Sequence, residues 1–235
     1  MKLIKPSIRN TDPLTPKSFT NPFFITMKKS FFIFFYLLSI ATSTMAQPAP
    51  TLSNAQKQRQ QQVRNIYAEA QQNAELQKNS DNEAAQYVTV TWPRMEAAVG
   101  KVVETIEYFS VPMTDEKTEM RYYSLQLVRR NYKRLEASIG DNYSEYLFDT
   151  KSGILLFYYE VHNNWWCDEQ VKVETRCYFN ADGSYSSGNV KLTALQGDKT
   201  PYYPAELQEI NALDIQRESS RYSISFNTIT NFTME

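Results

Sequence analysis

Apolar residues recur at a helical spacing over residues 54–78. Ser53, followed three residues later by Gln56, is typical of a capping box, in which each residue satisfies a backbone N–H of the other. The apolar positions fall on one stripe with the spacing i, i+3, i+4, i+7, i+11, and the other positions are mostly polar. The stripe consists of Val63, Ile66, Tyr67, Ala70 and Ala74. The pattern predicts an amphipathic helix over 54–78 that lies on the surface of a core.

Between residues 86 and 195 the apolar period changes to two, which predicts strands. Lys151-Ser152-Gly153 and Ala181-Asp182-Gly183 interrupt the runs with glycines that supply the positive φ of tight hairpins. The two hairpins echo each other in sequence, as successive hairpins of a meander do. We therefore expect an antiparallel sheet of about six to seven strands over 86–195, with residues 163–169 forming a loop between two of them.

A second helix is expected over residues 204–220. Pro204 suits the first turn of a helix, and Leu207, Ile210 and Leu213 give it an apolar edge. Residues 221–235 are ambiguous, because Tyr222, Ile224 and Phe226 alternate like a strand but also fit a continuing helix. We favour a helix followed by a frayed or short extended end. Helices segregated from an antiparallel sheet define the α+β class, here a meander flanked by an N-terminal and a C-terminal helix.

The alternation also predicts which side chains share a face of the central hairpin. Two sets are expected to pack under the helices: Leu155, Phe157, Tyr159 and Val161 on one strand, and Val171, Val173, Cys177 and Phe179 on the next. A third set is expected on the outer, solvated face: Tyr158, Glu160, Lys172, Glu174, Arg176 and Tyr178. Mixed charges and tyrosines are ordinary on an exposed sheet face, but they also suit a platform for a ligand.

Residues 27–46 are typical of a secretory signal peptide. Lys28 and Lys29 precede an apolar run over 31–40, and small residues end at Ala46. The run is shorter than the roughly 20 residues of a membrane span, so an uncleaved anchor is the weaker interpretation. We expect cleavage near Ala46, a periplasmic or secreted product, and a single α+β domain over 47–235. Residues 1–26 have no periodicity and are interpreted as a start-site error, with an unusually long charged n-region as the alternative.

The charge of the exported part argues against two classes of partner. The whole chain has 25 basic and 26 acidic side chains. Removal of residues 1–46 takes away more basic than acidic side chains and leaves a net charge of about −6. An acidic chain of this kind favours neither nucleic acid nor an anionic membrane surface, and the mature chain has no apolar run long enough for a transmembrane segment.

Cys167 and Cys177 are the only cysteines in the chain. An oxidising compartment permits a disulfide between them. If residues 171–179 form one straight strand, however, the two thiols lie too far apart unless the chain folds back after Cys167. The alternative is a buried Cys177 that acts as a small apolar residue.

Three motifs resemble a group of exported, uncharacterised proteins of Bacteroidota. They are Ala68-Glu69-Ala70 in the first helix, the Tyr-Leu-Phe-Asp-x-x-x-Gly run at 146–153, and the Glu-Thr-Arg-x-Tyr-Phe-Asn-x-x-Gly run at 174–183. The resemblance covers most of residues 55–190. It implies export and a hairpin meander, and it carries no catalytic or binding residues.

Few residues suggest chemistry. His162 is the only histidine in the sequence, which argues against a His-rich metal cluster. A Ser or Cys hydrolase with a histidine base would have to use His162, and a pair with Cys167, five residues away, is conceivable. Trp165 and Trp166 are adjacent near a hairpin end, where at least one is expected to be exposed and available to a sugar or a protein; alternatively both cover the end of the core. The chain has no glycine-rich phosphate loop.

From these patterns we expect a non-catalytic exported binding module that needs no metal or cofactor. Its ligand would be an envelope protein, peptide or glycan, bound through Trp165 and Trp166 or through a sheet face that carries Tyr158, Glu160, Arg176 and Tyr178. Two alternatives remain open: a hydrolase of envelope polymers or peptides, and a structural or assembly factor of the envelope.

Overall fold

The computed structural model describes residues 51–79, 87–97, 100–135, 141–166, 169–195 and 209–232. Two helices flank seven strands in the order α2 (Asn54–Asn79), β1 (Tyr87–Glu96), β2 (Gly100–Thr114), β3 (Arg121–Arg134), β4 (Asn142–Phe148), β5 (Leu155–Trp166), β6 (Glu169–Phe179), β7 (Tyr185–Ala194) and α3 (Ala212–Phe232). The expected leader over 1–46 lies outside the described residues. Neither described helix combines the length and apolar character that a membrane crossing needs.

The strands form one seven-stranded sheet in which each strand pairs antiparallel with the next. The α+β meander predicted from the alternation is therefore confirmed. Three pairings contain a register shift, at Phe109/Ser110, Leu147/Phe148 and Tyr178/Phe179. Each shift inserts one residue and changes which face the following side chains occupy.

Helix α2 begins where the capping box predicts. The Ser53 N–H donates to Gln56 Oε1 over 2.9 Å, and the Gln56 N–H donates to Ser53 Oγ over 3.2 Å. Val63, Ala70 and Ala74 of the predicted stripe are fully buried. Small side chains at two of these positions allow the helix to lie close to the sheet.

Helix α3 differs from the prediction in its position. Residues 204–208 lie outside the described residues, residues 209–211 are not helical, and the helix runs from Ala212 to Phe232. The alternation of Tyr222, Ile224 and Phe226 is helical: Tyr222 and Phe226 are one turn apart and buried, whereas Ile224 is 66% exposed. The expectation of a frayed or extended end was wrong. Residues four apart, such as Tyr222 and Phe226, share a face in a strand as well as in a helix, so their spacing did not distinguish the two.

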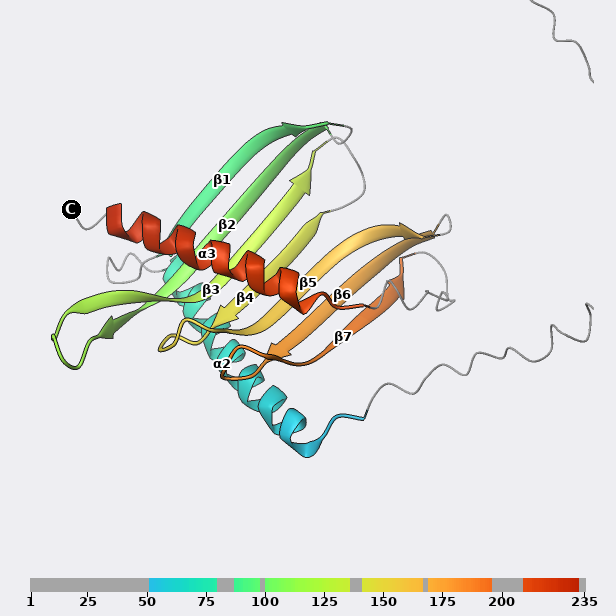
Figure 1. The fold of residues 1–235 in the computed structure, drawn as a ribbon. Coiled ribbons are helices and arrows are strands. Elements are labelled where there is room, and N and C mark those ends of the chain that lie inside the picture. The colour runs from blue at the N-terminus through green and yellow to red at the C-terminus, as the bar shows by residue number, and fades with distance from the viewer. Residues whose placement is uncertain are drawn as a thin grey trace, which may run out of the picture. The chain divides into compact units, whose positions relative to one another are not determined.

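The two helices cover opposite faces of the sheet, as Figure 1 shows with α3 in front and α2 behind. Directly paired residues of adjacent strands share a face, so the register fixes both faces. Toward α3 lie Tyr108, Val128, Tyr146, Tyr158 and Cys177, which pack against Tyr222 and Phe226. Toward α2 lie Phe109, Leu127, Leu147, Phe157 and Tyr178.

This arrangement corrects two face predictions. Leu155 and Phe157 were expected on one face, but the bulge between β4 and β5 places Leu155 with the α3 cluster and Phe157 with the α2 cluster. The sheet also has no wholly solvated outer face, because each face carries a helix. The predicted loop over 163–169 is wrong in part, since β5 continues to Trp166 and β6 starts at Glu169.

Candidate functional site

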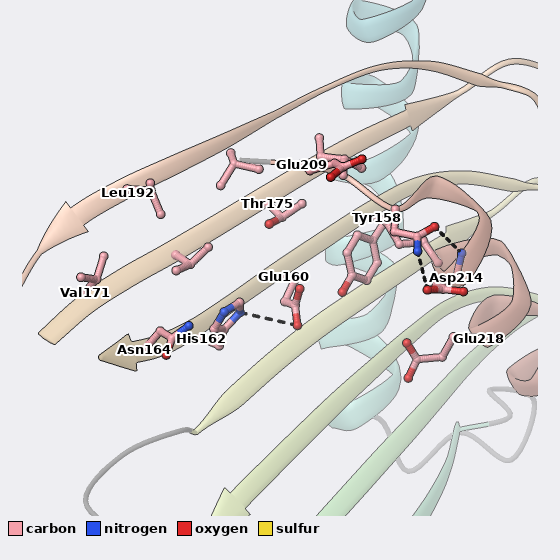
Figure 2. Close-up of a pocket in the computed structure, with 15 residues that line it drawn as sticks. Tyr158, Glu160, His162, Asn164, Val171, Thr175, Leu192, Glu209, Asp214 and Glu218 are labelled. Atoms are coloured by element: carbon pink, nitrogen blue, oxygen red, sulfur yellow. Dashed lines mark hydrogen bonds and ion pairs between the residues drawn. The ribbon is translucent and has the colours of Figure 1, made fainter. Parts of the chain in front are cut away.

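A cleft of about 300 Å³ lies on the α3 face, between strands β5–β7 and the first turns of α3 (Figure 2). Alternate residues of β5, from Tyr158 to Asn164, line its floor. The facing residues of β6 and β7 form one wall, and the segment that leads into α3 forms the other. The cleft exists because α3 covers only part of this face.

A close approach between β7 and the start of α3 shapes the cleft. Gly188 pairs with Cys177 on the α3 face, and a Cβ atom at Gly188 would lie 2.6 Å from Ile210 Cδ1 and 2.7 Å from the backbone oxygen of Arg176. Only glycine leaves room for Ile210 there. Asn211 then caps α3, since its Oδ1 accepts the Asp214 N–H over 3.2 Å.

Glu160 is the carboxylate at the floor of the cleft. Its Oε1 accepts a hydrogen bond from Asn142 Nδ2 over 2.9 Å, and His162 Nδ1 lies 3.6 Å away. Burial by itself would raise the pKa of Glu160, but His162, Asn142 and Tyr158 together outweigh it and hold the pKa below its ordinary value. Glu160 is therefore ionised at neutral pH.

His162 faces the cleft next to Glu160. Its Nδ1 is fully buried and has no hydrogen-bond partner among the described residues, and the separation of 3.6 Å from Glu160 is an ion-pair distance rather than a hydrogen bond. His162 pairs across the sheet with Asn142 and Val173. Cys167, its predicted partner in a Cys–His arrangement, lies outside the described residues.

Glu218 is a carboxylate of the cleft that comes from α3. It accepts hydrogen bonds from Tyr146 Oη over 2.7 Å and from Tyr222 Oη over 3.0 Å, and Arg130 Nη1 lies 3.8 Å away. Burial, followed by neighbouring negative charge, raises the pKa of both tyrosines, so they stay neutral donors. Glu218 thus has two tyrosine donors and a nearby arginine, whereas the partners of Glu160 are Asn142, His162 and Tyr158.

The opposite wall of the cleft is aliphatic. Val171 and Val173 of β6 form a small cluster with Val190 and Leu192 of β7. Thr175 continues the same row of β6 and is only 9% exposed. Its hydroxyl lines the cleft and makes no hydrogen bond to the described residues.

The structure separates the residues that were predicted to form one platform. Tyr158 and Glu160 line the cleft, whereas Arg176 and Tyr178 lie on the α2 face. The reason is register: Tyr158 pairs with Cys177, so Arg176 falls opposite Tyr159. The prediction had assumed that even-numbered residues of both strands share a face.

Arg176 and Tyr178 have structural roles on the α2 face. The Arg176 guanidinium lies over the Tyr159 ring, 5.3 Å from its centroid. Tyr178 is buried against Phe157, and its hydroxyl accepts a hydrogen bond from Arg64 Nε over 3.3 Å. Both contacts hold α2 and β5 to the sheet.

The backbones of Trp165 and Trp166 belong to β5 and pair with Gln170 and Glu169. Their side chains lie outside what the structure describes, so a binding role for them stays a prediction.

Cys177 is a free cysteine at the centre of the α3 face and is fully buried. Burial, followed by the charge of Glu160, raises the pKa of its thiol to about 12. Because Cys167 lies outside the described residues, the disulfide stays a prediction. In the structure Cys177 acts as the small apolar residue that the alternative described.

Among the described residues, no three His, Cys, Asp or Glu side chains come together closely enough to hold a metal ion. The acids of the cleft are therefore distributed around it rather than convergent on one point.

Three of the acidic residues at the cleft were not identified from the sequence: Glu209, Asp214 and Glu218. Two local signals could have placed them. Asn211 and Asp214 have the spacing of a helix cap, and Tyr222 and Phe226 have the spacing of a buried helical turn. Together these signals give the start and the inner face of α3.

Comparison with protein-family models, with curated proteins and with solved structures gives no match for this chain.

Proposed function

We propose that this chain is an exported binding module without catalytic activity, and that its ligand enters the cleft between α3 and strands β5–β7. The observation that supports the proposal most strongly is the composition of the cleft. An aliphatic wall, the hydroxyl-bearing side chain of Thr175 and an ionised Glu160 face one another around a volume of about 300 Å³. Binding sites typically combine such an apolar lining with a few placed polar groups.

The ligand is drawn from the envelope, as a protein segment, a peptide or a glycan. Support for export is the signal-peptide pattern over 27–46. The resemblance to exported proteins of Bacteroidota agrees with it. The proposal moves the binding surface from the tryptophans at the hairpin end to the α3 face.

Hydrolysis has one observation in its favour, since Glu160 and Glu218 both line the cleft. A carboxyl pair that cleaves a glycosidic bond needs one member with a raised pKa to act as the acid. The pKa of Glu160 is instead lowered, and both oxygens of Glu218 accept hydrogen bonds from tyrosines. The same pair is therefore better suited to holding a ligand than to donating a proton.

The test blocks the cleft with a bulky side chain. Val190→Trp fills the space beside Thr175, while Asn189→Trp places the same group on the opposite, exposed face of β7 as the matched control. Protein purified from cells that express the full chain is incubated with size-fractionated peptides and glycans from envelopes. Thermal unfolding then reports which fraction stabilises it.

We expect at least one fraction to raise the melting temperature of the wild type and of Asn189→Trp, with no effect on Val190→Trp. Mass spectrometry of the recovered ligand should show unchanged mass. A product whose formation Glu160→Gln abolishes would make the protein a hydrolase. A stable complex with one outer-membrane component that survives Val190→Trp would favour an assembly factor. If no fraction stabilises the wild type, the binding proposal is wrong.

A further inference from the structure

The cleft is strongly asymmetric in charge. Four carboxylates line it: Glu160, Glu209, Asp214 and Glu218. Among the described residues that line it, none is a lysine or an arginine. Figure 2 shows Glu160 and Glu218 on either side of the Tyr158 ring, with Glu209 and Asp214 at the rim nearer α3.

These four acids differ in whether a basic side chain of the protein lies near them. Arg130 lies 3.8 Å from Glu218, and Arg217 lies 3.3 Å from Asp214. Within the described part of the chain, the partners of Glu160 are His162 and the neutral Asn142 and Tyr158, and Glu160 is ionised. A half-buried carboxylate with no arginine or lysine partner favours a positive group brought by a ligand.

Two features besides the acids specify the shape of that positive group. First, Thr175 lines the cleft and pairs directly with Glu160 across the two strands, and its hydroxyl can accept a hydrogen bond. Second, an aliphatic cluster lies next to Thr175 on strands β6 and β7. It consists of Val171, Val173, Val190 and Leu192. The ligand therefore pairs a donor with an aliphatic chain.

The spread of the acids distinguishes an organic cation from a metal ion. Because no three potential ligands in the described part of the chain converge on one point, the cleft lacks the geometry of a metal centre. An alkylammonium group is larger, donates three hydrogen bonds in different directions and carries its own apolar stem. Glu160 and the Thr175 hydroxyl can each accept one of them.

We propose that the cleft binds an alkylammonium group on an aliphatic chain, with the ammonium between Glu160 and Thr175 and the methylenes along the valine and leucine wall. This inference rests on the proposed function and specifies the ligand class of the same site. A lysine side chain of a peptide and a free diamine share this chemistry, and the experiment separates them.

Three probes test the proposal, and the amide chemical shifts of the protein report their binding. Each probe is titrated up to about 10 mM, because such small ligands bind with dissociation constants on the order of 1 mM. They are acetyl-Ala-Lys-Ala-amide, the same peptide with an acetylated lysine, and 1,5-diaminopentane. We expect the charged peptide or the diamine to shift amides of β5–β7 that flank the cleft. Its dissociation constant should rise with ionic strength, as for any partly exposed ion pair.

Glu160→Gln keeps the size and hydrogen-bonding capacity of the side chain and should weaken binding at least about tenfold, since hydrogen bonds to charged groups are the stronger ones. Glu174→Gln is the matched control, because Glu174 lies on the other face of the sheet, where Lys172 Nζ donates to it over 2.8 Å. Glu209→Gln removes a second carboxylate of the cleft. Because Glu209 is exposed, this variant should keep the fold intact.

The outcomes are distinct. Tighter binding of the charged peptide assigns the site to lysine side chains, and tighter binding of the diamine assigns it to free amines. Equal binding of the charged and the acetylated peptide, blocked by Val190→Trp, overturns the alkylammonium assignment and leaves the binding function standing. No binding of either amine, while an envelope fraction still stabilises the protein, overturns it as well.

Discussion

The ion pair between Arg129 and Glu145 under helix α2 permits the sharpest test of how this fold is held together. Arg129 Nε donates to Glu145 Oε1 over 3.2 Å, and Arg129 Nη1 donates to Glu75 Oε1 over 2.7 Å. The Glu145 side chain is 4% exposed and also accepts hydrogen bonds from Tyr67, Tyr143 and Gln71. The pair therefore joins α2 to strands β3 and β4.

Arg129→Met removes the cation and leaves a buried carboxylate without its counter-charge. Breaking a buried pair from one side costs about 3–5 kcal/mol. For a domain of this size, the loss corresponds to a fall in melting temperature of about 6–20 °C. The double variant Arg129→Met/Glu145→Gln removes both charges and keeps an acceptor for the tyrosines, so we expect it to recover about half of the loss.

Urea unfolding followed by circular dichroism measures these free energies. Arg217→Met is the matched control, because its ion pair with Asp214 is exposed and should contribute less than about 1 kcal/mol. A loss below about 1 kcal/mol for Arg129→Met, or a double variant no more stable than the single one, would refute the reasoning.

Three further predictions concern the α3 face. Gly188→Ala should destabilise the fold by about 1–3 kcal/mol in urea unfolding, because its Cβ would lie 2.7 Å from the backbone oxygen of β6; an unchanged midpoint would contradict the close approach. Phe226→Ala should cost about 3–5 kcal/mol and Ile224→Ala less than about 0.5, in line with exposures of 1% and 66%; equal losses would contradict the assignment of a helix there. In a Cys167→Ser background, Cys177 should react with a thiol reagent only on unfolding, because its thiol pKa is raised to about 12; fast labelling of the native protein would contradict its burial.

The sheet and the first helix were predictable because each rests on a long, regular pattern. Helix α2 has a capping box and a stripe over several turns, and the strands are punctuated by Gly153 and Gly183, which both have positive φ in the structure. Such signals are local, so they survive without knowledge of the partner element.

The faces of the sheet were not predictable, because they depend on register. The bulge at Leu147/Phe148 is set by the hairpin that follows it, and it turns Leu155 and Phe157 to opposite faces. The pairing of Tyr158 with Cys177, which separated Tyr158 from Arg176, is likewise a relation between strands. A shift of one residue reverses every assignment on a strand, so period alone could not place the cleft.

The position of α3 explains why the polar residues of this face gather where they do. Tyr222 and Phe226 cover the rows of the sheet that carry Tyr108 and Tyr146, where nearly every side chain is aromatic or aliphatic. One row further along, Ile106, Arg130, Ser144, Glu160, Thr175 and Val190 cross the sheet. The arginine of that row, Arg130, pairs with Glu104 and lies near Glu218. A helix laid over the part of the row that carries Glu160 would have to bury the charge of Glu160 at a large desolvation cost. The cleft is thus the consequence of an acidic residue placed beyond the edge of the covering helix, and Glu160→Gln removes that charge without altering the register that positions it.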